Sequence, residues 1–158
     1  MQWSTEPHGG FTASEKPVLP VIARGPYRYE HVNVADQRRD PNSMLNWMER
    51  IIRMRKEVPE IGWGDFAILS TGTPAVVAIR YDWRNNSVVV LHNLSGKPCE
   101  VRLDVGLEHP ERLPLVNLLS NDHSVADKSG RHGCILEPYG YRWYRVGGLD
   151  YILKRSDA

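Results

Sequence analysis

From residue 66 onward the chain carries seven short segments with the composition of β-strands and no helical pattern between them. The segment Asp82–Asn86 is rich in turn-forming residues and joins two β-branched runs, which predicts a hairpin. Several short strands at this spacing predict an antiparallel β-sandwich, so the expected fold is mainly β. The predicted strands are 66–70, 75–82, 87–93, 100–104, 115–119, 133–137 and 141–146.

The last predicted strand, 141–146, places aromatic side chains on both of its faces. Side chains alternate between the two faces of a strand. Tyr141 and Trp143 therefore share one face with Arg145, whereas Tyr144 lies on the other. This pattern predicts a strand that is covered on both sides.

Before the β region lie a long irregular segment and one amphipathic helix. Residues 1–40 show no sustained helical or strand period, although Asn33 is placed to cap a short helical turn. A helix is predicted over 41–57, with Asp40 as its N-cap and Pro41 at its first position. The pattern indicates that this helix ends at Pro59 and Gly62. Its apolar stripe comprises Met44, Leu45, Met48, Ile51 and Ile52.

The composition excludes several classes of protein. The 158 residues carry a net charge of only +1, and the basic residues are scattered, so neither nucleic acid nor an anionic membrane is an expected partner. No apolar run is long enough to span a bilayer, and the N-terminus lacks a secretory pattern. The two cysteines and the scattered histidines match no zinc motif. We expect a cytoplasmic protein with no metal and no cofactor.

Several segments of the chain resemble the α-amylase family (glycoside hydrolase family 13), in the version found in trehalose synthases. Residues 1–4 (Met-Gln-Trp-Ser) with Gly10-Phe11 are similar to a sequence motif of this family. Residues 19–22 and 25–37 look like the trehalose synthase form of the segment that follows it. Residues 43–56 resemble the last helix of the family's catalytic barrel, and residues 136–144 are similar to its final C-terminal strand.

The resemblance implies a division of the chain into three parts. Residues 1–60 would be the end of a (β/α)8 barrel, namely a loop and the last barrel helix. Residues 63–147 would be the C-terminal antiparallel β-sandwich, and residues 148–158 a loosely attached tail. Because the chain begins within a family motif, we expect it to correspond to the C-terminal part of such an enzyme.

The resemblance also implies a reaction. Trehalose synthases interconvert maltose and trehalose with retention, which requires a carboxylate nucleophile and a carboxylic acid about 5–5.5 Å apart. In the family these carboxylates precede the region that this chain matches, so no catalytic residue is assigned and the chain alone is expected to be inactive. Gln2, Trp3 and Phe11 are the candidate sugar-binding residues at the rim of the site. Aromatic faces pack on pyranose C–H groups, and an amide both donates and accepts hydrogen bonds.

Two alternatives remain open at this stage. The β region is also compatible with an independent sandwich that binds an α-glucan or a protein partner, with Trp83 as an exposed aromatic residue. The apolar face of helix 41–57 is expected to contact either a second copy of the chain or a separate chain that supplies the barrel. The run Asp122-His123-Ser124 has the residue types of a hydrolytic triad but is interpreted as a polar loop, because triads form through space.

Overall fold

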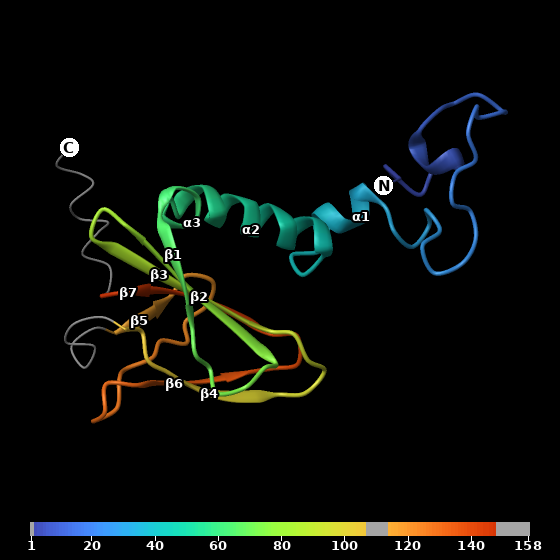
Figure 1. The fold of residues 1–158 in the computed structure, drawn as a ribbon. Coiled ribbons are helices and arrows are strands. Elements are labelled where there is room, and N and C mark those ends of the chain that lie inside the picture. The colour runs from blue at the N-terminus through green and yellow to red at the C-terminus, as the bar shows by residue number, and fades with distance from the viewer. Residues whose placement is uncertain (1, 107–113, 148–158) are drawn as a thin grey trace. The chain divides into compact units, whose positions relative to one another are not determined.

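The computed structural model describes residues 2–106 and 114–147 (Figure 1). The chain divides into two compact units, one ending at Arg53 and the other beginning at Met54. The assignment of the first part to the end of a barrel stays a prediction. The predicted tail, 148–158, lies outside the described residues.

The first unit contains the short 3-10 helix η1 (Pro7–Gly10), helix α1 (Val34–Arg39) and most of helix α2 (Met44–Glu57). The predicted cap at Asn33 is confirmed, because its side-chain oxygen accepts a hydrogen bond from the backbone N–H of Asp36 at 2.9 Å. A cap of this kind satisfies one of the free N–H groups of the first helical turn.

The predicted start of α2 is wrong by three residues, since the helix begins at Met44 rather than at position 41. Asp40 ends α1 instead, donating its backbone N–H to the carbonyl of Asp36 at 3.2 Å. The cap of α2 is Ser43, whose hydroxyl accepts from the backbone N–H of Asn46 at 3.2 Å. The sequence offers two good capping residues within four positions, and the end of α1 has already engaged the first.

The predicted end of α2 at residue 57 is confirmed, whereas the terminating role predicted for Gly62 is wrong. The helix ends at Glu57, and a further short helix, α3 (Glu60–Trp63), follows directly. Pro59 lies two residues after this end, where a proline disfavours continuation of the helix, and it caps α3, whereas Gly62 lies inside α3 and does not terminate α2. A Pro fits the start of a helix because its missing N–H has no intrahelical partner there.

The second unit confirms the mainly β, antiparallel fold. Within the described residues, five strands form one sheet in the order β1-β2-β3-β7-β5, and β4 pairs with β6 in a second sheet. The strand pairs are antiparallel, and the seven strands coincide with the seven predicted segments to within two residues. The strands are β1 (Asp65–Leu69), β2 (Val76–Trp83), β3 (Asn86–Asn93), β4 (Cys99–Leu103), β5 (Leu115–Asn117), β6 (His132–Leu136) and β7 (Tyr141–Val146).

The predicted hairpin joins β2 and β3 through two residues, Arg84 and Asn85. Both have positive φ values, 48° and 64°, as the tightest hairpin turns require. The core of this unit is an apolar cluster contributed by both sheets. It comprises Val76, Ala78, Val89, Leu91, Val101, Leu103, Val105, Leu115, Leu136 and Tyr144.

Strand β7 is covered on both faces, as its sequence predicts. Tyr144 (3% exposed) belongs to the core between the sheets. On the opposite face, Arg145 is 5% exposed and its Nη1 donates to Oε1 of Glu60 on α3 at 2.7 Å. The short helix α3 therefore lies on the outer face of the five-stranded sheet, packed on β2 and β3 and joined to β7 by this ion pair.

Candidate functional site

The N-terminal loop is folded back on itself by backbone hydrogen bonds around η1. The N–H of Trp3 donates to the carbonyl of Gly9 at 2.8 Å, and the N–H of Phe11 donates to that of His8 at 3.3 Å. Gly9 has φ +65°, and a Cβ there would lie 3.1 Å from Cβ of Gln2. Both the backbone conformation and the close approach favour glycine at this position.

This loop borders an open hollow of about 620 Å³ with a largely apolar lining. Several lining side chains are highly exposed, Val18 at 99%, Leu19 at 76% and Ile22 at 55%. The lining residues are Gln2, Phe11, Thr12, Ser14, Lys16 and the segment 17–22. The volume falls within the range of pockets that bind small molecules.

The structure brings two of the three predicted sugar-binding residues to this pocket. Phe11, 53% exposed, lines it together with Gln2. The side chain of Gln2 is 6% exposed, and its Nε2 donates to the carbonyl oxygen of Tyr27 at 3.2 Å, so one amide donor already holds the loop. Trp3, also 53% exposed, is not among the described residues that line the pocket.

Carboxylates of the first unit have local partners. The Asp36 carboxylate accepts from Nδ2 of Asn33 at 2.7 Å, and Asp40 accepts from the N–H of Asn42 at 2.9 Å. Glu49 accepts from Arg53 one turn later on α2 at 2.9 Å. These are capping and surface contacts rather than the paired arrangement that a glycosidase requires.

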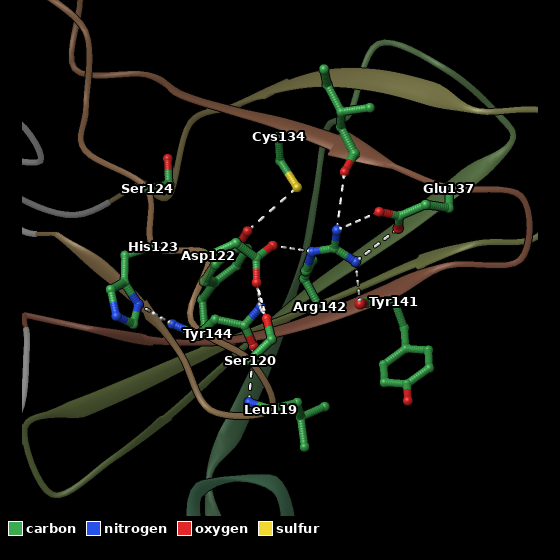
Figure 2. A network of polar contacts seen from close by, with 12 residues as sticks. Leu119, Ser120, Asp122, His123, Ser124, Cys134, Glu137, Tyr141, Arg142 and Tyr144 are labelled. Carbon is green, nitrogen blue, oxygen red and sulfur yellow. Dashed lines mark hydrogen bonds and ion pairs between the residues drawn. The ribbon is translucent and has the colours of Figure 1, made fainter. Parts of the chain in front are cut away.

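The run Asp122-His123-Ser124 does not assemble a triad, as expected for a polar loop (Figure 2). Oδ2 of Asp122 accepts from Nε of Arg142 at 2.5 Å, and Nδ1 of His123 accepts from the backbone N–H of Asn117 at 3.1 Å. The hydroxyl of Ser124 lies 3.2 Å from Nδ1 of a different histidine, His132. The three side chains therefore serve three separate contacts.

Arg142 on β7 is the centre of the polar network in Figure 2. Its two terminal nitrogens donate to the two carboxylate oxygens of Glu137 at 2.9 and 3.0 Å, and this bidentate contact lowers the pKa of Glu137. Nearby, Sγ of Cys134 lies 3.5 Å from the hydroxyl of Tyr144, and burial raises the pKa of both groups. The thiol is therefore protonated at neutral pH, which suits packing rather than nucleophilic chemistry.

In residues 2–106 and 114–147, no three His, Cys, Asp or Glu side chains form a group that could hold a metal ion. Among these same residues, no helix combines the length and the apolar character needed to cross a bilayer.

Two parts of the chain match models of known protein families. Residues 1–64 match the model of the alpha amylase catalytic domain, and residues 86–145 match that of the sucrose hydrolase-like C-terminal domain. The trehalose synthase of Pimelobacter sp. (strain R48) is 30% identical over 95% of this chain. The chain belongs to the α-amylase family. The trehalose synthase of Thermus thermophilus is also similar, at 29% identity over 97% of the chain.

The chain spans only part of these α-amylase-family relatives, 27% of the Pimelobacter enzyme and 16% of the Thermus enzyme. A solved structure, the trehalose-6-phosphate hydrolase of Bacillus licheniformis, is 26% identical with a TM-score of 0.69. That match covers 93% of this chain and 25% of the hydrolase.

The sequence reading missed the most deeply buried ion pair in the described residues. Glu60 (0% exposed) lies within the catalytic-domain match, and Arg145 is the last residue of the C-terminal-domain match. Their contact at 2.7 Å links residues 85 positions apart. The only local signal is that Glu60 follows Pro59, which suits an acidic residue in the first turn of a helix.

Proposed function

We propose that this chain serves as the C-terminal part of an α-amylase-family enzyme that acts on α-glucosides of the maltose and trehalose type. The order of the two family matches supports this, since a catalytic-domain segment precedes a C-terminal-domain segment. Relatives named trehalose synthase and aligned over nearly the whole chain support the substrate class. The proposed reaction is retaining transglucosylation, an isomerisation of maltose and trehalose.

The observation that carries the proposal is the exposed apolar surface of the segment that matches the catalytic domain. The whole of α2 is described, none of its residues is buried, and Met44, Met48 and Ile52 on its apolar stripe are 42–66% exposed. Val18 and Leu19 in the loop are still more exposed. Exposed apolar side chains along one helix face are typical of a surface that another surface covers.

We assign that covering surface to the remainder of a catalytic barrel, supplied outside this chain. The matched part is 27% of one trehalose synthase and 16% of the other, so most of each relative lies outside the match. The two carboxylates that the reaction needs would come from there. Pairing of α2 with a second copy of the chain is the competing outcome.

Within the assembled enzyme, the loop would form part of the rim of the sugar site. Phe11 would offer an apolar face to the pyranose ring, and Trp3 a second one. Gln2 would act mainly by holding the loop through its hydrogen bond to Tyr27. The second unit, from Met54 onward, would support the barrel.

The test is a chimera in which this chain replaces the matched part of the Pimelobacter trehalose synthase. We expect conversion of maltose to trehalose by the chimera, followed by NMR of the anomeric protons, and no conversion by the chain alone. Phe11→Ala in the chimera is expected to raise KM, with Val125→Ala, an exposed residue of the second unit, as the matched control. Maltose turnover by the chain alone, or a chimera without conversion, would overturn the proposal.

The independent glucan-binding module receives no support from Trp83. This residue ends β2, and the guanidinium of Arg84 lies 4.4 Å from the centre of its ring, so one face of the indole is already occupied.

A further inference from the structure

The segment 118–131, which connects β5 to β6, is held to the β-sheets through Ser124. The backbone N–H of Ser124 donates to the carbonyl of Leu115 at 2.9 Å, and the N–H of Leu115 donates back to the carbonyl of Ser124 at 2.8 Å. The hydroxyl of Ser124 donates to the carbonyl of Gly133 at 3.3 Å and lies 3.2 Å from Nδ1 of His132. Leu115 belongs to the apolar core, so Ser124 ties the segment directly to the core of the second unit.

The hydrogen bonds of Ser124 determine which nitrogen of His132 carries the hydrogen. Because the single hydroxyl hydrogen is donated to Gly133, the oxygen of Ser124 accepts from His132, and Nδ1 is therefore the protonated nitrogen. The second ring nitrogen, Nε2, is buried and has no hydrogen-bond partner among the described residues. His132 is 0% exposed and thus sits in the fold as a neutral ring that uses one of its two nitrogens.

Protonation of His132 would place a second N–H group and a charge in this buried site. The new N–H at Nε2 would meet no acceptor among the described residues, and the charge would be removed from water, so both changes oppose folding. In water an imidazole takes up its proton at a pH of about 6.5. The ring therefore accepts the proton more readily once it has left its site, which requires the contact with Ser124 to break.

The neighbouring strands do not compensate for a charge on His132. The residue opposite it on β4 is Leu103, 1% exposed, whereas Arg102 and Asp104 alternate to the other side of that strand. On β6, Cys134 shares the face of His132, and burial raises the pKa of its thiol, so it carries no charge near neutral pH.

The charged group that acts on the ring from the connecting segment is Asp127. Its carboxylate is occupied by the backbone N–H groups of Ser129 and Arg131, at 2.7 and 3.1 Å. Burial lowers the pKa of His132, and the charge of Asp127 opposes that change to a smaller extent. The balance around the ring thus favours the neutral form for as long as the ring stays buried.

We propose that the contact between His132 and Ser124 is a pH-sensitive latch, which opens when His132 is protonated and then releases segment 118–131 from the core. Above about pH 6.5 neither form takes up the proton, and the closed latch is favoured. Below it the open form binds a proton that the closed form does not, so the open population rises as the pH falls. For one histidine this rise is about tenfold between pH 7.5 and 5.5. The latch acts within the second unit and is independent of the sugar chemistry proposed above.

The test is amide hydrogen exchange of the full chain, followed by NMR at pH 7.5 and 5.5 and corrected for the intrinsic exchange rates. The amides of Ser124 and Leu115 report the latch, because each donates to the other residue. We expect both to be less protected than the amides of β3 at either pH, and their protection factors to fall about tenfold at the lower pH. His132→Asn, whose side-chain amide still donates to Ser124 but does not titrate, should abolish this fall.

His92→Asn is the matched control, since His92 is a half-buried histidine on β3 whose pKa is also lowered by burial. It should leave the fall at Ser124 unchanged. Protection of Ser124 equal to that of β3, with a fall that His92→Asn reduces, would show that the segment opens only with the whole unit and would overturn the inference. A fall that persists in His132→Asn, or no fall in the wild type, overturns it as well. The wild type and the control decide between local and whole-unit opening even where His132→Asn does not fold.

Discussion

The buried ion pair between Glu60 and Arg145 gives the sharpest test of the fold. The change is Glu60→Gln, which keeps the shape of the side chain and removes its charge. Arg145, 5% exposed, then loses the carboxylate that lies 2.7 Å from its Nη1. Removal of one partner of a buried pair costs about 3–5 kcal/mol, because the remaining charge stays desolvated. Oε2 of Glu60 has no hydrogen-bond partner in the described residues, which favours the lower end, about 3 kcal/mol.

The assay is urea unfolding followed by tryptophan fluorescence. At a typical slope of about 1–3 kcal/mol per molar urea, a loss of about 3 kcal/mol shifts the midpoint by at least about 1 M. The matched control is Glu49→Gln on α2, whose pair with Arg53 is about two-thirds exposed on both sides and contributes no more than about 0.5 kcal/mol. The double variant Glu60→Leu/Arg145→Met should recover most of the loss, since apolar replacement of both partners removes the desolvation penalty. A Glu60→Gln shift as small as that of the control would refute the reasoning.

Two further predictions concern pH and packing. Burial lowers the pKa of His132 and of His92. As the pH falls below the ordinary histidine pKa of about 6.5, the unfolded chain therefore binds protons that the folded chain does not. The free energy of unfolding should be constant above about pH 6.5 and fall below it. His132→Gln should reduce this slope in urea titrations between pH 7.5 and 5.0, and an unchanged slope would contradict the role of His132. Gly64→Ala should destabilise the second unit by about 1–3 kcal/mol, because the new Cβ would lie 2.6 Å from the carbonyl oxygen of Asp82. Gly133→Ala, which meets nothing within 4 Å, should leave the melting temperature nearly unchanged, and equal effects of the two variants would reject the steric argument.

The sequence was sufficient to predict the β-sandwich because its signals are local. Alternation in 141–146 predicts a strand covered on both faces, and the observed burial of Trp143, Tyr144 and Arg145 agrees. The turn residues Arg84 and Asn85 separate two β-branched runs that pair along their full length. The spacing of apolar residues and the composition of turns are properties of neighbouring residues, so both can be recognised from the sequence alone.

The helix boundaries and the directions of the loop side chains were less predictable, because both depend on contacts that the local sequence pattern does not determine. Asp40 and Ser43 are both good caps, and only the end of α1 decides between them. Of the three predicted rim residues, Phe11 and Gln2 line the pocket and Trp3 does not, and the role of all three in sugar binding stays a prediction. The direction of a side chain in an irregular loop depends on hydrogen bonds such as that from Gln2 to Tyr27, which no period reveals.

The Glu60–Arg145 pair also bears on how the two family segments are joined. Helix α3 has four residues, too few to be stable by itself, so it depends on its contact with the sheet. In any other placement of α3 on that sheet, the charges of Glu60 and Arg145 would be buried but separated, which would cost several kcal/mol of folding free energy. The charge pair therefore selects one placement of α3 on the sheet even if its net contribution to stability is small. Because Glu60 lies in the catalytic-domain match and Arg145 in the C-terminal-domain match, this selection fixes how the end of the first segment meets the second. A buried ion pair is suited to this task, since apolar contacts alone would tolerate a shifted helix.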